Sequence, residues 1–244
     1  MDYKHLSERL HRAGEFVPEG AILADIGSDH AYLPAYLIMK NKISSAIAGE
    51  VVDGPYLSAK NLVAELNLVD KIDVRKGDGL AVVSPEDNVT AISICGMGGS
   101  LIRDILHRGL LGNHLTGKET LVLQPNIGEP TLRTWLVNNY YEIIKEDIIR
   151  ENEKTYEIIV AKKIESLMPL SEKELLFGPH LLKQQGPIFT NKWQHELKQF
   201  ENILTQLEKS TKNVSEKIEE IQTKINLVKE VLKWVSQDMN LSKD

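Results

Sequence analysis

The first two-thirds of the chain alternate between short apolar runs and longer amphipathic stretches. The apolar runs are rich in alanine and β-branched residues, and we predict strands at 21–26, 45–50, 71–75, 91–95 and 120–124. The stretches between them have apolar positions at helical spacing, and we predict helices at 31–40, 55–66, 99–108 and 129–138. Strands that are apolar on both faces and alternate with helices are typical of a parallel sheet. The pattern therefore predicts an α/β fold with helices on both faces of the sheet.

A different connection is expected at the end of this region. Two further strands are predicted at 141–150 and 156–162, and only residues 151–155 separate them. A parallel crossover needs about a dozen residues or more. This last pair is therefore predicted to be an antiparallel hairpin.

After about residue 165 the strand pattern stops, and an apolar position recurs every three or four residues, as in a coiled coil. The series comprises Trp193, Leu197, Phe200, Leu204, Leu207, Thr211, Val214, Ile218, Ile221, Ile225, Val228, Leu232 and Val235. One continuous helix of that span would be about 64 Å long and would need a partner chain. The polar stretch Lys209–Asn213 offers a turn instead, so we favour an antiparallel pair of helices and a monomer over a coiled-coil dimer. We expect two domains, a sheet domain at 1–164 and a helical coiled-coil domain at 165–244.

The composition of the 244-residue chain excludes several classes of protein. Hydrophobic residues make up 42% and charged residues 26%, which is typical of a globular protein rather than a disordered one. No apolar run approaches the roughly 18 residues of a membrane-spanning helix, and the first twenty residues lack a signal-peptide core. The single cysteine, Cys95, excludes an intramolecular disulfide and favours a cytoplasmic protein. The net charge of −6 argues against a protein that coats nucleic acid, and the histidines lack metal-site spacing.

The polar segment Asp25–Tyr32 follows the first predicted strand, at the edge where an open α/β sheet binds its ligand. Gly27 lets the backbone approach a ligand closely. A dinucleotide-binding loop has three glycines in the pattern G-x-G-x-x-G, whereas this loop has one. A ligand without a pyrophosphate is therefore expected here.

Two further carboxylates are expected at neighbouring strand ends. Glu50 ends the second strand, where a carboxylate can accept hydrogen bonds from both hydroxyls of a ribose. Asp78 follows the third strand and can accept a hydrogen bond from an exocyclic adenine amine. A single acidic residue at a strand end is more often simply hydrated. Three in succession on neighbouring strands indicate a nucleoside site.

These residues resemble the class I S-adenosylmethionine-dependent methyltransferases, and the whole chain resembles the bacterial tRNA (adenine-22-N1)-methyltransferase family. The resemblance depends on LSERL (Leu6–Leu10), ADIGSDHAYLP (Ala24–Pro34), AGEVVDGP (Ala48–Pro55), KGDGL (Lys76–Leu80), CGMGG (Cys95–Gly99) and LQPN (Leu123–Asn126). It implies a Rossmann-like, mostly parallel sheet in the order 3-2-1-4-5-7-6, with the last strand antiparallel, and a coiled-coil tail. It also implies S-adenosylmethionine as the cofactor, tRNA as the partner and N1 of adenine 22 as the target.

The resemblance also implies which residues bind the cofactor. They are Asp25, Gly27, Ser28, Asp29 and His30 at the methionine end, Glu50 at the ribose, Val51, Asp78 and Gly79 at the adenine, and Cys95 and Gly96 over the sulfonium. The [DNS]PP[YF] loop of enzymes that methylate exocyclic amines is absent, and Gly96–Gly99 stands in its place. This difference favours methylation of a ring nitrogen.

The chemistry of adenine N1 indicates what the site has to do. N1 has an in-plane lone pair, so it needs alignment with the methyl group at about 3–3.5 Å and no covalent enzyme intermediate. Because N1 lies on the Watson–Crick edge, the base has to be extruded from its tRNA contacts. Asp29 is our candidate catalytic residue, since a carboxylate can stabilise the cationic product or take its proton. The predicted substrate-binding residues are Arg9, Gly98, Gly99, Gln124, Pro125 and Asn126.

Within that set, either Asn126 or Gln124 is expected to hydrogen-bond the base edge, unless residues 124–126 form a plain turn. The basic residues form either a tRNA phosphate patch, with Arg9 as its preferred member, or a solvated helix face; they are Lys4, His5, Arg9, His11, Arg12, Arg75, Lys76 and Arg103. Cys95 as the nucleophile of a pyrimidine methyltransferase is a minor alternative.

Two functions of other classes stay open at this stage. One is a coiled-coil interaction protein whose sheet domain binds a nucleoside without catalysis, and the other is a nicotinamide-dependent oxidoreductase. Titration with S-adenosylmethionine and NAD separates all three.

Overall fold

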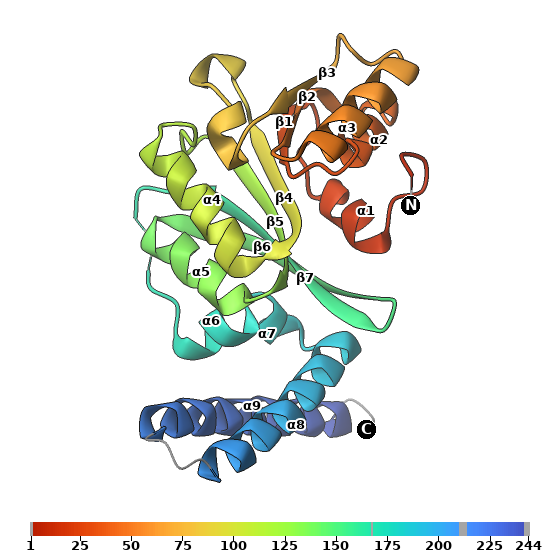
Figure 1. The fold of residues 1–244 in the computed structure, drawn as a ribbon. Coiled ribbons are helices and arrows are strands. Elements are labelled where there is room, and N and C mark those ends of the chain that lie inside the picture. The colour runs from red at the N-terminus through yellow and green to blue at the C-terminus, as the bar shows by residue number, and fades with distance from the viewer. Residues whose placement is uncertain (1, 167, 210–213, 242–244) are drawn as a thin grey trace. The chain divides into compact units, whose positions relative to one another are not determined.

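The computed structural model describes residues 2–166, 168–209 and 214–241 (Figure 1). The strands are β1 (Ala21–Ile26), β2 (Ile43–Glu50), β3 (Ile72–Lys76), β4 (Ala91–Gly98), β5 (Thr120–Ile127), β6 (Tyr141–Glu151) and β7 (Lys154–Lys163). The helices are α1 (Glu8–Glu15), α2 (Tyr32–Met39), α3 (Asp53–Glu65), α4 (Gly99–Leu111), α5 (Glu129–Asn138), α6 (Glu172–Phe177), α7 (Leu181–Gln184), α8 (Pro187–Glu208) and α9 (Ser215–Leu241). Two short 3₁₀ turns, η1 (Gly79–Val82) and η2 (Pro85–Asp87), join β3 to β4.

The strands form a single sheet in the order β3-β2-β1-β4-β5-β7-β6. β1 to β5 pair in parallel, and β7 is antiparallel to both β5 and β6. The predicted sheet order and the predicted terminal hairpin are therefore confirmed. The chain order reverses between β1 and β4, and open α/β sheets bind ligands beyond the carboxyl ends of the strands at such a point.

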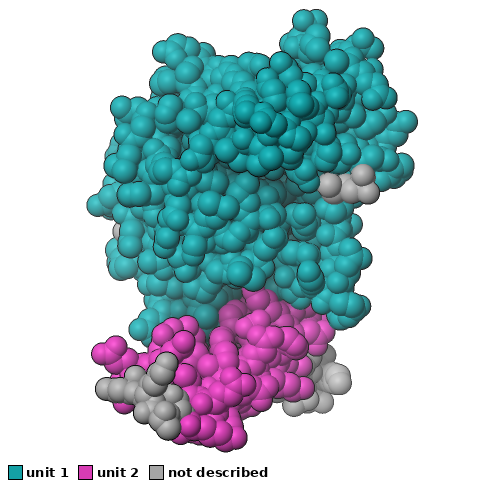
Figure 2. Space-filling model, in the orientation of Figure 1, with its two compact units in different colours: residues 1–180 teal, residues 181–244 magenta. Residues whose placement is uncertain are grey.

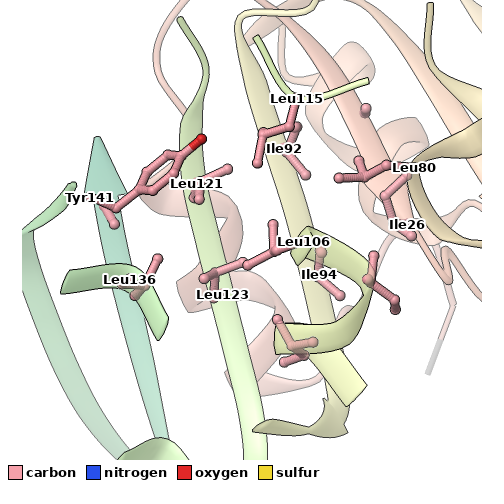
Figure 3. Close-up of a cluster of buried hydrophobic side chains, with 14 of the residues drawn as sticks. Ile26, Leu80, Ile92, Ile94, Leu106, Leu115, Leu121, Leu123, Leu136 and Tyr141 are labelled. Carbon is pink, nitrogen blue, oxygen red and sulfur yellow. The ribbon is translucent and has the colours of Figure 1, made fainter. Parts of the chain in front are cut away.

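Alternate side chains of the central strands enter two separate hydrophobic clusters. Leu121 and Leu123 of β5 belong to one cluster, whereas Val122 belongs to the other. In the first cluster, Ile92 of β4 and these two leucines gather with Leu106 of α4 (Figure 3). Because both faces of the sheet are covered, its strands have the continuous apolar runs that predicted a parallel sheet.

The end of β4 differs from the prediction. The strand was expected to end at Cys95, but β4 continues through Gly98; α4 begins at Gly99, as predicted. The register of β4 with β5 shifts on both sides of Met97. Such irregularities bend a strand and redirect its side chains, so this segment is an extended, irregular strand end.

The chain divides into two compact units, residues 1–180 and 181–244 (Figure 2). The boundary between the units lies after residue 180, later than the change in sequence pattern at 165. The segment 165–180 belongs to the first unit because it forms hydrogen bonds with α5 and β6. Arg133 of α5 donates to the carbonyls of Leu175 and Leu176, both at 3.3 Å. The backbone N–H of His180 donates to Glu146 at 2.9 Å.

The second unit consists of three helices in its described part. α8 and α9 pack on each other, and Lys229 of α9 forms an ion pair with Glu201 of α8 at 2.8 Å. The apolar series predicted the buried residues Ile221, Ile225 and Val228, but after them Val231 is buried rather than Leu232. An α-helix has 3.6 residues per turn, so positions repeated every seven residues gradually rotate away from the buried face.

The chain therefore has two helices where one long helix was the alternative. Residues 210–213 of the predicted turn, with Thr211, lie outside the described residues, as does the side chain of Val235. No helix in the described ranges is both long and apolar enough to cross a membrane.

Candidate active site

The ends of β1, β2 and β3 are joined to one another by backbone hydrogen bonds. The N–H of Gly27, just after β1, donates to the carbonyl of Gly49 in β2 at 2.9 Å. The N–H of Gly77, just after β3, donates to the carbonyl of Glu50 at 2.8 Å. The strand ends at Asp25 and Glu50 and the loop that carries Asp78 therefore meet at one edge of the sheet, as the sequence predicted.

Asp25 is buried at the end of β1, with 3% of its surface exposed. Its carboxylate accepts hydrogen bonds from the hydroxyls of Ser28 at 2.5 Å and Ser93 at 2.6 Å. Burial raises the pKa of Asp25, and the two hydroxyls act in the opposite direction. Asp25 thus holds the loop to β4. Sequence reasoning missed Ser93, although it is the only hydroxyl in the apolar run 91–95.

The loop after β1 has an uncommon backbone. Gly27 has a φ of +69°, and Asp29, His30 and Ala31 follow with φ values of +42°, +71° and +57°. Consecutive non-glycine residues in the left-handed region are costly and mark segments that the surrounding structure holds in place. The turn directs the N–H of Asp29 at a carboxylate oxygen of Glu50. The Asp29 side chain remains exposed, 3.5 Å from His30, whose ring stacks on Tyr32.

Glu50 is a second buried acidic residue at this edge, with 6% of its surface exposed. One of its oxygens accepts the Asp29 N–H, and the other has no protein donor among the described residues. Burial raises the pKa of Glu50, and the nearby charges of Asp29 and Asp25 act in the same direction. This second oxygen is not one of the buried atoms that lack a hydrogen-bond partner, so it is open to solvent and to a ligand that brings hydroxyl groups.

The end of β3 presents a more open arrangement. Asp78 is exposed, and Arg108 of α4 donates to its two oxygens at 3.1 and 3.3 Å. Gly79 has a φ of +56°, and a Cβ there would lie 3.1 Å from Ile105. Val51 follows Glu50 and is 58% exposed. Sequence reasoning missed Arg108, which competes with any ligand for the Asp78 carboxylate.

Cys95 and Met97 define the β4 side of the edge. Burial and the charge of Asp25 raise the pKa of the Cys95 thiol far above its ordinary range, which speaks against the covalent chemistry of the minor alternative. A Cβ on Gly27 would lie 2.1 Å from Cε of Met97. The Met97 methyl group therefore lies against Gly27, where the strand order reverses. Sequence reasoning missed Met97, because its direction depends on the irregular end of β4.

Gln124 is fully buried and has each of its amide groups engaged. Its oxygen accepts from Arg9 Nη1 at 2.7 Å and from the Gly96 N–H at 3.0 Å. Its nitrogen donates to the carbonyl of Pro125 at 2.9 Å and to Oδ1 of Asn126 at 3.3 Å. Asn126 is exposed, and its Nδ2 donates to the carbonyl of Gly96 at 2.7 Å. Of the two amides predicted to contact a base, only Asn126 is available.

Three other predicted substrate residues differ in accessibility. Pro125 is buried, so it shapes the strand end rather than presenting a surface. A Cβ on Gly99 would lie 2.3 Å from the carbonyl oxygen of Gly128, so Gly99 packs the start of α4 against the start of α5. A Cβ on Gly98 would meet nothing within 4 Å, so Gly98 is open to a ligand.

The predicted basic patch is largely paired with carboxylates. Arg9 lies 3.9 Å from Glu151 and over the ring of Tyr156, and Arg12 donates to Asp147. The other pairs are Arg75 with Asp87, Lys76 with Asp53, and Arg103 with Asp104. These contacts favour structural roles for the arginines over a free phosphate-binding surface.

The sheet order, the antiparallel β7 and the row of polar strand ends together define a class I methyltransferase. The model of the tRNA (adenine(22)-N(1))-methyltransferase family matches residues 23–230. The tRNA (adenine(22)-N(1))-methyltransferase of Bacillus subtilis (strain 168) is 42% identical over 238 residues, which cover 95% of this chain and 99% of that protein. The chain therefore belongs to this family.

Solved structures agree with this assignment. The crystal structure of the B. subtilis m1A22 tRNA methyltransferase has a TM-score of 0.86 and covers 93% of this chain and 99% of that one. A Streptococcus pneumoniae protein solved with S-adenosyl-L-methionine is 44% identical, with a TM-score of 0.84 over 93% of this chain and 100% of that one. A Mycoplasma capricolum protein solved with S-adenosyl-homocysteine is 27% identical, with a TM-score of 0.77 over 93% and 98%.

These relatives lend no support to an oxidoreductase or to a non-catalytic interaction protein. In the described part of the chain, no cluster of histidine, cysteine and acidic side chains is suited to a metal ion.

Proposed function

We propose that this protein transfers a methyl group from S-adenosylmethionine to N1 of adenine 22 in tRNA. The observation that carries the proposal is Glu50, which has 6% of its surface exposed and one carboxylate oxygen without a protein donor among the described residues, at the edge where open α/β sheets bind their ligands. Because the substrate is tRNA, we expect the protein to work in the cytoplasm. The ion pair between α8 and α9 within one chain supports a monomer.

The residues at this edge fit the cofactor. Glu50 would accept hydrogen bonds from the ribose hydroxyls, and Val51 would pack on the adenine. Asp78 and Gly79 would lie at the adenine edge, where Arg108 has to release Asp78 or share it. The loop of Gly27, Ser28, Asp29 and His30, held by Asp25, would bind the methionine end, with Cys95 and Gly96 opposite.

When bound, the cofactor would supply an electrophilic methyl group on a sulfonium. As the adenine N1 lone pair forms the new bond to the methyl carbon, the carbon–sulfur bond would break, its electron pair would stay on sulfur, and S-adenosylhomocysteine would leave. The adenine becomes cationic and then loses a proton from N6 to water. Asp29 is exposed at this edge, so we propose that its carboxylate stabilises the positive charge. Asn126 and the open backbone at Gly98 would receive the extruded base.

The proposal is tested by methylating an unmodified tRNA transcript and identifying the product nucleoside by mass spectrometry. We expect 1-methyladenosine, and a transcript with guanine at position 22 should yield none. N6-methyladenosine, or methylation that persists after the change at position 22, would contradict the proposal.

Cofactor affinity is expected to depend on pH through Glu50. Since burial raises its pKa, Glu50 takes up a proton at a pH above the ordinary glutamate value of about 4.3. The protonated acid is a weaker acceptor for ribose hydroxyls, so affinity for S-adenosylhomocysteine should fall several-fold as the pH drops toward that range. Titration calorimetry across this pH range measures the effect. In Glu50→Gln the pH dependence should weaken to what Asp25 contributes, since burial raises the pKa of Asp25 as well, and an unchanged pH profile would argue against the assignment of Glu50.

A further inference from the structure

The side chains of Arg9, Gln124 and Asn126 form a hydrogen-bonded chain with a fixed direction. A guanidinium has only donors and stays protonated, and the backbone N–H of Gly96 is also a donor. Both point at the same atom of the Gln124 amide, at 2.7 and 3.0 Å. That atom must therefore be the oxygen, because an amide nitrogen would place donor against donor.

The orientation of Gln124 then determines that of Asn126. With its oxygen toward Arg9, Gln124 turns its nitrogen toward Oδ1 of Asn126 at 3.3 Å. The nitrogen of Asn126 faces the carbonyl of Gly96 at 2.7 Å, which also requires a donor. Each amide along the chain is thus assigned by the group before it.

Asn126 has hydrogen-bonding capacity left over, whereas Gln124 has none. A side-chain amide has two N–H groups and an oxygen with two lone pairs. Asn126 uses one N–H on Gly96 and one lone pair on Gln124. One donor and one acceptor remain on an exposed side chain beside the end of β4.

We propose that Asn126 binds the Hoogsteen edge of the target adenine, accepting from N6 and donating to N7, in the orientation that Arg9 sets through Gln124. The inference rests on the proposed function and adds which edge of the base is held. Asparagine pairs with adenine N6 and N7 through one acceptor and one donor. This contact leaves N1 free for methyl transfer.

The same contact discriminates between bases. Guanine presents two acceptors on that edge, O6 and N7, so the oxygen of Asn126 would face O6 without a proton between them. Positive charge spreads to N6 as N1 gains the methyl group, so the bond from N6 to Asn126 strengthens in the transition state. Asn126 is then a catalytic residue, and Arg9 and Gln124 are positioning residues that do not touch the base.

The test uses tRNA with 7-deazaadenine at position 22, which replaces N7 by a C–H group and keeps N1 and N6. We expect kcat/KM of the wild-type protein to fall about 10-fold, the lower part of the range for such a pair. Asn126→Ala should lose a similar factor on normal tRNA and lose nothing further on the 7-deaza substrate. The two losses should therefore not add, which is expected only if Asn126 contacts N7 directly. A general loss of activity in the variant, or a changed reactivity of N1 in the 7-deaza base, would give losses that add.

The role of Arg9 is tested with the same two substrates. We call the fall in kcat/KM from normal tRNA to the 7-deaza substrate the 7-deaza penalty. Arg9→Met should lower kcat/KM on normal tRNA and should reduce this penalty. Arg9→Lys keeps a donor, so both its kcat/KM on normal tRNA and its penalty should lie between those of Arg9→Met and the wild-type protein. Asn61→Ala, at an exposed asparagine of α3, should keep the full penalty. Asn126→Ala should still fold, and its affinity for S-adenosylhomocysteine should fall by a smaller factor than its kcat/KM on normal tRNA, although the variant loses the bonds to Gln124 and Gly96.

Two results would overturn the inference: equal rates of the wild-type protein on both tRNAs, or a full 7-deaza penalty in Asn126→Ala. If Arg9→Met and the wild-type protein had the same 7-deaza penalty, Arg9 would not set the orientation of Asn126. A wild-type protein that does not methylate adenine 22 of normal tRNA would instead refute the proposed function.

Discussion

Replacing Glu50 with alanine is expected to weaken the binding of S-adenosylhomocysteine by about 100-fold or more, because each hydrogen bond to a charged group contributes about 1.5–3 kcal/mol. Two ribose hydroxyls would lose their acceptor, and the Asp29 N–H would lose its partner as well. Titration calorimetry measures the change directly. The free protein should still fold, since the buried carboxylate that is removed has a raised pKa and is itself costly.

Two further variants separate the possible causes of the effect. Glu50→Gln keeps one acceptor and should lose less affinity than Glu50→Ala. Glu65→Ala removes an exposed glutamate at the end of α3 and should bind as the wild-type protein does. If Glu50→Ala bound the ligand with unchanged affinity, Glu50 would not belong to the site.

Replacing Arg133 with alanine is expected to lower the free energy of unfolding by about 3–5 kcal/mol, the usual cost of breaking a buried ion pair. The Arg133 side chain is completely buried, and it binds Glu146 at 2.8 Å and also Glu157. Its removal leaves two buried carboxylates without the guanidinium that they bind. It also releases the carbonyls of Leu175 and Leu176.

Urea unfolding measures this loss, with Arg150→Ala as the control. Arg150 forms an exposed pair with Glu153, and such pairs contribute about 0–1 kcal/mol. Combining Arg133→Ala with Glu146→Gln should recover part of the loss, because one buried charge is then removed. A loss no larger than that of Arg150→Ala would show that the buried cluster does not stabilise the fold.

The helices and strands could be predicted from the sequence because they depend on local patterns, whereas the strand order was implied by the resemblance to a known family. The bounds of β1 and α5 agree with the predicted ranges to the residue, since a continuous apolar run and an amphipathic segment with clear ends specify them. The acidic strand ends were also predictable, because parallel strands bring their carboxyl ends to one edge.

Contacts between residues far apart in sequence were not predictable in the same way. Arg108 contacts Asp78 only because α4 packs beside η1. Met97 reaches Gly27 only because the end of β4 is irregular. Gln124 was one of the two amides expected to contact the base, but α1 brings Arg9 to it across 115 residues of sequence. Each of these positions depends on register and packing that no single segment encodes.

The position of α1 has a practical consequence for work with this protein. Arg9 and Arg12 connect this helix to Gln124 and to the β6–β7 hairpin, so α1 is held against the same edge of the sheet as the proposed site. A truncation that removes Arg9 and Arg12 would therefore break contacts with β5 and with the β6–β7 hairpin.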